Sequence, residues 1–434
     1  MEASFDERQI RIANKTEDFR FIIHCYLVRS RSSVAPHLRS VDQPSSFFTL
    51  LKLHLLPLLV SALFVSADFL HAGNNRKLIE TLLENEYLTE EQAADLLANE
   101  PTVVRPAGDH FKNFRIRGRI QAQAAYVYSR DDDDSEDYST VELRRVYLGV
   151  QGTLFQNVRA QIDAILLPGS NLDLRSAFLQ WREYEEAFVK VGYDRPVFGF
   201  EHTTSSTTIL TVERSTVTQT IVPDDTVGIA VDGKISSFGY GIGIYTNRDN
   251  GNISGEGRYL YSLSGSWRAD DLLPENQKLQ FRTDLLFNDD NVGIGTGDSP
   301  NFLYKRGVSV SGHYVLNDFD FRAEYLYADS FDSDATHGWY VMPSYFITEK
   351  LQVVGRYEQL HSDANEGLRS PNRYARRAID QNGDRFKAIY AGTNYYFKGD
   401  ANKVMFGVEL SELETSTAGD QESVTIYGAW RVLF

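Results

Sequence analysis

Residues 426–434 end the chain with a strict alternation of side chains. Ile426, Trp430 and Phe434 fall at even positions, whereas Arg431 falls at an odd position. Successive side chains of a β-strand point to opposite faces, so the apolar set shares one face and the polar set shares the other. The segment therefore predicts a strand with one face in an apolar surround and the other in contact with polar groups or water.

The same period of two runs through most of the chain. Between residues 114 and 124, apolar or small side chains occupy the even positions and Arg or Gln occupies the odd positions. Residues 158–166 and 278–287 repeat this pattern. We count sixteen such segments, from 114–128 to 422–434, each about as long as the ten residues that a tilted membrane-crossing strand needs.

The connections between these segments alternate in length. Residues 131–138 and 363–383 form long connections, whereas 155–156 and 316–317 form tight turns. Long external loops and tight periplasmic turns produce this alternation in a membrane barrel, and a β-sandwich or propeller has no reason to show it. We therefore predict an all-β fold, a transmembrane antiparallel β-barrel of about sixteen strands in the bacterial outer membrane.

Composition fits a barrel with a wet interior. The chain has 24% charged residues but also 24 Tyr and 26 Phe among its 434 residues. It is too polar for a bundle of membrane helices, and its aromatic content suits a barrel surrounded by outer-membrane lipid. The net charge of −16 argues against nucleic acid as a partner, because phosphate binding needs a clustered basic surface.

The N-terminal part follows other patterns. An apolar run near residues 50–64 is too short to cross a membrane as a helix and precedes Val65-Ser66-Ala67, a small-x-small cleavage pattern. An uncut signal anchor is the alternative. Helical spacing follows, with a capping box from Thr89 to Gln92. The predicted segments are a leader and signal peptide (1–67, with the single cysteine, Cys25), a periplasmic helical hairpin (74–100), a linker (101–110) and the barrel (111–434).

One long connection, residues 198–224, differs from the others. It is rich in Ser and Thr and has few of the charges that mark the other external loops. A third external loop of this length and polarity can fold back into a barrel and narrow it, so we interpret it as a constriction loop. The candidate constriction residues are His202, Glu213, Arg214, Asp224 and Asp225.

Basic side chains at water-facing positions are candidates for lining a pore. Three guanidinium groups at period two on one strand can pass an anion along a wall. The candidates are Arg115, Arg117 and Arg119 on that strand, with Arg144, Arg145 and Arg159 extending the set. The alternative is that these arginines pair with interior carboxylates and stabilise the barrel. The carboxylates considered are those of Glu142, Asp163, Asp284 and Glu324.

Several segments carry a family resemblance. Residues 143–155, 174–181, 191–199 and 204–215 resemble successive signatures of the phosphate-selective porin O and P family. The resemblance implies a porin of sixteen strands, a homotrimer, in which anions pass basic side chains to a constriction that holds Arg and Lys. Members often carry Pro-Gly-Arg-Arg before the sixth strand, whereas this chain has Pro223-Asp224-Asp225-Thr226 and so lacks those cations.

These features favour a passive diffusion channel for small hydrophilic solutes, including anions such as phosphate, without a cofactor, a metal or a covalent step. The alternative is a structural or adhesive barrel that the hairpin of residues 74–100 anchors to periplasmic partners. No Gly-x-Ser-x-Gly nucleophile motif and no His-x-x-x-His zinc pair occurs in the sequence. We therefore expect that the protein is not an enzyme.

Overall fold

The structure is a computed structural model, and it describes most of the chain after residue 110. The described residues are 111–130, 135–169, 172–247, 259–289, 301–332, 334–369, 373–378, 380–416 and 419–434. The leader and signal peptide, the helical hairpin and the linker predicted for residues 1–110 lie outside this part. Within it, no helix has the length and apolar character needed to cross a membrane.

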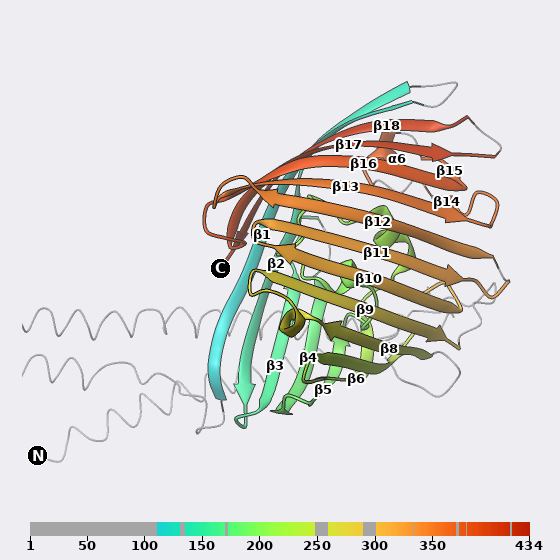
Figure 1. The fold of residues 1–434 in the computed structure, drawn as a ribbon. Coiled ribbons are helices and arrows are strands. Elements are labelled where there is room, and N and C mark those ends of the chain that lie inside the picture. Colours follow the sequence, from blue (N-terminus) through green and yellow to red (C-terminus); the bar gives the residue numbers. More distant parts are fainter. Residues whose placement is uncertain are drawn as a thin grey trace, which may run out of the picture. The chain divides into compact units, whose positions relative to one another are not determined.

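Sixteen antiparallel strands close into one barrel, in which each strand pairs with its neighbours in sequence (Figure 1). The barrel strands are β1 (Phe111–Arg130), β2 (Ser135–Leu154), β3 (Val158–Ile165), β4 (Asp173–Tyr184), β5 (Ala187–Asp194), β6 (Thr226–Ile235), β7 (Phe238–Thr246), β8 (Tyr259–Arg268), β9 (Gln277–Asn288), β10 (Arg306–Leu316), β11 (Phe319–Asp329), β12 (Ala335–Phe346), β13 (Leu351–Ser362), β16 (Arg385–Tyr396), β17 (Asn402–Glu414) and β18 (Gln421–Leu433). The predicted fold class and strand number are confirmed.

The remaining described elements are short and lie in the connections. They are α4 (Phe200–Thr203), α5 (Thr216–Ile221), the 3₁₀ helix η1 (Asp270–Leu272), α6 (Ala375–Ala378) and the two-stranded ribbon of β14 (Leu368–Arg369) with β15 (Asn382–Gly383). α4 and α5 occupy the connection between β5 and β6, and α6 and the ribbon occupy the connection between β13 and β16.

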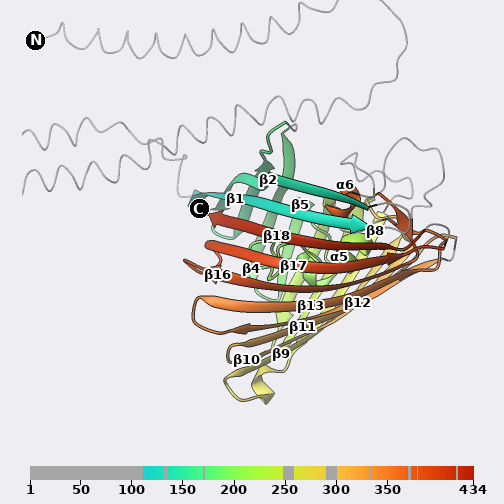
Figure 2. The same ribbon diagram turned by 90° about the horizontal axis from the view of Figure 1, so that it is seen from above.

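The first and last strands close the barrel. β1 pairs with β18 from Arg119 opposite Leu433 to Arg130 opposite Glu422, and the two strands lie side by side in Figures 1 and 2. At the seam, the N–H of Gly118 donates to the Phe434 carbonyl at 2.7 Å and the N–H of Phe434 donates back at 3.1 Å. The terminal segment is therefore a full member of the sheet, and no strand edge is left open there.

Burial is inverted relative to a water-soluble protein. On β18, Trp430 is 55% exposed and Ile426 is 38% exposed, whereas Arg431 and Thr425 are fully buried. The polar side chains point into the barrel and the apolar ones point out, as the alternation predicted. An apolar exterior around a polar interior is stable only when lipid surrounds the barrel.

Connection lengths separate the two ends of the barrel. We call the end at which β1 begins and β18 ends the short-turn end, and the opposite one the long-loop end. The turn between β2 and β3 has only three residues, 155–157, and Phe155 and Gln156 in it both have positive φ. The loop predicted at residues 131–138 is shorter than expected, because Ser135–Tyr138 already belong to β2.

The strands around the barrel differ in length. β1 and β2 have 20 residues each, whereas β3 and β5 have only 8, fewer than the sequence predicted. β5 stops at Asp194 because Pro196 lies two residues later and cannot donate a ladder hydrogen bond. Apart from β4, with 12 residues, the strands from β3 to β8 have 8 to 10 residues each, whereas the barrel strands from β9 to β18 have 11 to 13. This side of the barrel, β3 to β8, is called the low wall below.

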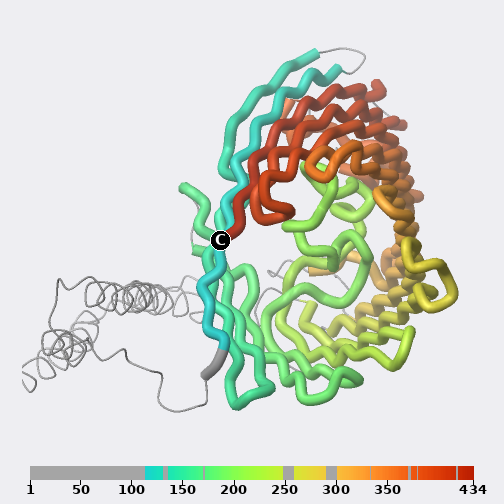
Figure 3. Tube along the Cα trace, turned by 60° about the vertical axis from the view of Figure 1, so that its left-hand side comes forward, coloured from blue at the N-terminus to red at the C-terminus, as the bar shows by residue number. Residues whose placement is uncertain are grey.

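The interior at the long-loop end contains apolar packing. Phe198, Val217 and Ile221 of the connection between β5 and β6 pack against inward-facing apolar residues of the strands, such as Leu326. A second cluster joins Val212 of the same connection to residues that include Tyr374 and Tyr427. The barrel is therefore partly filled by its own loops, as Figure 3 shows for the green trace.

Substitution of a glycine on the low wall tests how closely β4 and β5 pack. Gly192 of β5 has φ +142°, and a Cβ there would lie 2.2 Å from the carbonyl oxygen of Ala177 in β4. Gly192→Ala should lower the free energy of unfolding by about 1–3 kcal/mol, because the backbone must move. Denaturant titration of the detergent-solubilised barrel measures this. Gly428→Ala is the control, since a Cβ at Gly428 meets nothing within 4 Å, and equal losses in both variants would contradict the expectation.

Candidate functional site

The connection between β5 and β6, residues 195–225, lies inside the barrel and is called the inner loop below (Figure 3). Its helix α5 contacts β11, β12 and β13 on the far wall. The residues predicted to form a constriction loop, 198–224, fall within it. Buried main-chain groups of the loop that have no partner within it need partners from the wall, because such groups must be satisfied.

Carboxylates of three strands bind main-chain N–H groups of the inner loop. The acceptors lie on β9, β11 and β13, and the donors lie near the starts of α4 and α5, where helical N–H groups have no partner within the helix. The bonds run from Gly199 to Asp284 (2.9 Å), from Phe200 and Glu201 to Glu324 (2.6 and 3.0 Å) and from Thr216 to Glu358 (2.7 Å). These acids therefore hold the loop and are not free in the interior.

Cationic side chains donate hydrogen bonds to main-chain carbonyl oxygens of the inner loop. The donors come mainly from β13, β17 and β18. The bonds run from Arg356 to the Glu213 carbonyl (3.0 Å), from Lys403 to Ile209 (3.2 Å), from Arg431 to Thr207 (3.2 Å) and from Arg195 to His202. Wall cations and wall carboxylates thus fix the loop from two sides through its own main chain.

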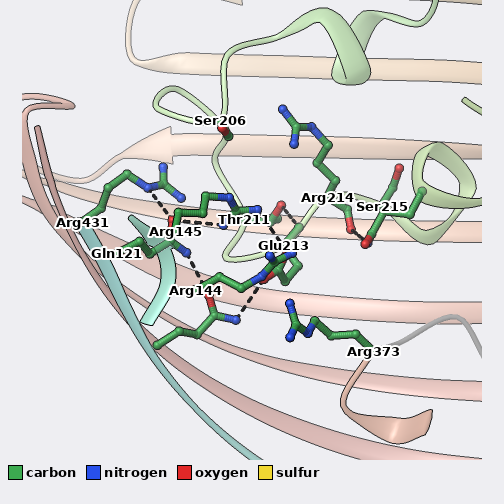
Figure 4. A network of polar contacts seen from close by, with 12 residues as sticks. Gln121, Arg144, Arg145, Ser206, Thr211, Glu213, Arg214, Ser215, Arg373 and Arg431 are labelled. Atoms are coloured by element: carbon green, nitrogen blue, oxygen red, sulfur yellow. Dashed lines mark hydrogen bonds and ion pairs between the residues drawn. The ribbon is translucent and has the colours of Figure 1, made fainter. Parts of the chain in front are cut away.

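The side chain of Glu213 makes the most concentrated contact with the wall (Figure 4). Its carboxylate accepts hydrogen bonds from Arg144 Nε at 2.7 Å, from Arg145 Nη2 at 3.3 Å and from Gln123 Nε2 at 3.0 Å. Arg145 and Glu213 are buried. Hydrogen-bonded ion pairs of this kind are strong when the carboxylate keeps all its partners.

A β-bulge explains how two adjacent arginines reach one carboxylate. Neighbouring residues of a strand normally point to opposite faces. In β2, Arg145 pairs with Gln121 of β1 and Leu143 pairs with Ala122, so Arg144 is an extra residue without its own partner position. The bulge turns Arg144 inward beside Arg145.

Burial and neighbouring charges shift the pKa values of three ionisable side chains of the inner loop. Burial raises the pKa of Glu213, but Arg144 and Arg145 lower it more, so that the pKa lies below its ordinary 4.5. Burial and the nearby Arg195 hold the pKa of His202 well below 6.5, and the imidazole is neutral at pH 7. Burial and Arg195 lower the pKa of Arg214 to about 9, so its guanidinium is charged at pH 7. Arg214 donates to the carbonyls of Glu201 and Thr204.

Two cavities lie between the inner loop and the wall of β1 to β9. The first has a volume of about 420 Å³ and is lined by Arg115, Arg117, Arg119, Arg175 and Arg195 among others. The second has a volume of about 520 Å³ and includes Arg175, Lys190, Arg195 and Arg282 in its lining. Together seven cationic residues line them, against three acidic residues, Asp163, Asp194 and Asp232. These two cavities are therefore basic although the whole chain is acidic. A third cavity, of about 510 Å³, lies on the other side of the loop, beside Thr208 and Leu210, and its lining is acidic, with Asp318, Asp320, Glu349 and Asp400 against Arg322 and Lys350.

The predicted wall arginines divide into two groups. Arg119, Arg144 and Arg145 bind the inner loop, Arg119 through the Ser206 hydroxyl at 2.5 Å. The others face the cavities or their edge. Arg117 pairs with Asp163 at 3.3 Å, Arg159 bonds only to Gln151 and Gln161, and Arg115 has no hydrogen-bond or ion-pair partner among the described residues.

The candidate acids at the end of the loop are also partly engaged. Asp225 forms ion pairs with Arg175 and Arg195, and the N–H of Asp224 donates to the Asn301 carbonyl at 3.0 Å. Arg175 and Arg195 were not among the predicted residues. Arg175 is the extra residue of a second bulge, since Asp163 of β3 pairs with Ser176 and Ala164 pairs with Leu174. Strict alternation cannot reveal such a position.

The fold and this site define a class of protein. A closed barrel of sixteen strands with an apolar exterior, a loop held inside it and charged cavities beside the loop is an outer-membrane porin. Residues 114–268 match the family model described as phosphate-selective porin O and P. The match confirms the predicted family resemblance over these residues and supports a bacterial outer-membrane location. A search of curated proteins finds no match.

Solved structures share the fold at low sequence identity. OmpT of Vibrio cholerae in its trimer form aligns with a TM-score of 0.50 at 14% identity, over 75% of this chain and 100% of that one. The channel DcaP of Acinetobacter baumannii gives 0.50 at 11% over 76% and 99%. The anion-selective porin from Comamonas acidovorans gives 0.50 at 11% over 74% and 99%. At these identities the likeness establishes the architecture.

The Glu213 anchor predicts a pH-dependent stability. Because its pKa is lower in the folded protein than the ordinary 4.5, the carboxylate stabilises the fold above about pH 4.5, and this contribution is lost as the pH falls further. Glu213→Gln should therefore cost about 2–3 kcal/mol in the free energy of unfolding at pH 7, with a smaller difference from wild type at low pH. Denaturant titration at several pH values measures this.

The matched control is Glu275→Gln, because Glu275 is exposed outside the inner loop. It should leave the free energy of unfolding within about 0.5 kcal/mol of wild type. A Glu213→Gln variant as stable as wild type at pH 7 would show that the anchor does not hold the loop.

Proposed function

We propose that the protein is a passive diffusion channel for small hydrophilic anions. The observation that carries the proposal is the excess of cationic side chains around the two cavities beside the inner loop. Positive charge on a low-dielectric wall raises the local concentration of anions and repels cations. The family match over residues 114–268 supports the same solute class.

Phosphate is one candidate solute among the small anions, and the proposed function does not depend on it. By the family resemblance, the chain has Asp225 and Thr226 where members with Pro-Gly-Arg-Arg carry two arginines. Asp225 pairs with two of the cavity arginines and so reduces the positive field at that point. We infer that the channel accepts small anions in general and favours phosphate less than a site of unpaired cations would.

A structural or adhesive barrel is the second candidate function. It is favoured by the apolar side chains of Phe198, Val217 and Ile221, which fill part of the interior at the long-loop end. A filled barrel would carry no steady ion current, so the conductance of the purified protein in planar bilayers distinguishes the two functions. A channel gives stable open levels that scale with salt concentration.

Two arginines without carboxylate partners test the anion preference. Arg115 and Arg159 contribute positive charge to the wall without pairing to an acid, so Arg115→Gln with Arg159→Gln should lower the anion-to-cation permeability ratio by about twofold. The zero-current potential in a salt gradient measures the ratio. Arg130→Gln is the control, since Arg130 is an exposed arginine paired with Glu422. A ratio unchanged in the double variant would contradict an anion path along this wall.

We also propose that the low wall packs against other copies of the chain in a homotrimer. The eight residues of β3 or β5 span about 19 Å along the membrane normal when tilted by about 45°, less than the apolar band of about 25 Å. Exposed aliphatic side chains, including Leu179, Ile242 and Ile244, cover this face. A second copy of the chain would cover this wall, whose height is less than the thickness of the apolar band of the membrane.

The trimer is tested by a charge on the low wall. Ile242 of β7 is 53% exposed on the outside of the barrel, and Ile242→Lys should reduce the trimer fraction in unheated gel electrophoresis by about tenfold. Leu410→Lys is the control, because Leu410 is equally exposed, at 52%, on β17 outside the low wall. Equal loss of trimer in both variants would place the interface elsewhere.

A further inference from the structure

The two cavities beside the inner loop meet at a small set of residues. Arg175, Asp194, Arg195 and Ser205 line both of them. We call these four residues the neck. Asp194 is engaged by Lys190, whose Nζ lies 2.8 Å from the Asp194 carboxylate. Two guanidinium groups and a hydroxyl are therefore common to the linings of both cavities, which is where a solute moving from one cavity to the other would meet them.

One carboxylate holds both guanidinium groups of the neck. Asp225 Oδ2 contacts Arg175 Nη1, and Asp225 Oδ1 lies 3.5 Å from Arg195 Nε. Arg195 Nη1 donates a hydrogen bond to the His202 carbonyl of the inner loop. The Asp225 side chain is 23% exposed, and those of Arg175 and Arg195 are 18% and 17% exposed. The group is thus partly exposed, and water or an ion can reach it.

A carboxylate between two arginines occupies the position that a bound anion takes in a guanidinium site. Arginine pairs recognise carboxylate and phosphate through the same N–H groups. We propose that Arg175 and Arg195 form the anion-binding site at the neck of the pore, and that Asp225 keeps this site weak as a built-in competing anion. The proposal rests on the function proposed above.

Weak binding has a consequence for transport. A channel conducts only if an ion binds well enough to enter a site and loosely enough to leave it. Two unopposed guanidinium groups at the neck would retain a multivalent anion, whereas the Asp225 carboxylate shares their N–H groups and cancels one positive charge. The neck then passes chloride and phosphate without trapping either.

The experiment measures chloride current through the full-length protein in planar bilayers while inorganic phosphate is added. Asp225→Asn should lower the phosphate concentration that halves the current by about five- to tenfold, because it removes the competing charge and keeps the side-chain volume. Asp232→Asn is the matched control. Asp232 lines only the second cavity and has no ion pair among the described residues, so its effect reports the general field alone.

Arg175→Gln tests the site from the opposite direction and does not depend on the folding of the Asp225 variant. It should raise the half-blocking phosphate concentration by at least about fivefold. Equal phosphate block in Asp225→Asn and Asp232→Asn, or an unchanged block in Arg175→Gln, would overturn the proposal while the channel itself conducts. Absence of steady current in the wild type would instead refute the proposed function.

Discussion

The buried carboxylate of Glu213 is the interaction on which the interior of this barrel depends. The inner loop brings a negative charge into a closed space where water is scarce, and such a charge is stable only with donors on several sides. Arg144, Arg145 and Gln123 supply them from two neighbouring strands. With Glu213 fixed, its carbonyl accepts a hydrogen bond from Arg356 of β13, and the helix α5 of the same loop contacts β11, β12 and β13.

The charges of the interior have two separate tasks. The acids Asp284, Glu324 and Glu358 accept hydrogen bonds from main-chain N–H groups of the loop. Two arginines, Arg356 and Arg431, donate hydrogen bonds to the loop's carbonyl oxygens. In the two cavities beside β1 to β9, cationic residues outnumber acidic ones, and this basic lining is available to a solute. A chain of net charge −16 can therefore present a positive path, because selectivity depends on local charge.

Sequence periodicity could predict the barrel because inside and outside alternate at every residue of a strand. It placed Arg431 inside and Trp430 outside, and it predicted the number of strands and the entry of a polar third loop. Alternation cannot account for Arg144 and Arg145 on the same face, although both were candidates, and it missed Arg175, because Arg144 and Arg175 each lie at a bulge where alternation fails for one residue. Nor could it tell which arginines bind the loop and which face the cavities, since partners such as Glu213 and Ser206 are distant in sequence.

The path beside the inner loop can be probed directly by a cysteine at Ser205, an exposed residue that lines both cavities. The sequence contains no other cysteine after Cys25. The measurement is the rate at which an anionic and a cationic methanethiosulfonate reagent block the current of Ser205→Cys. The account predicts faster block by the anionic reagent, because anions concentrate along this wall. Faster block by the cationic reagent, or a current that neither reagent changes, would contradict it.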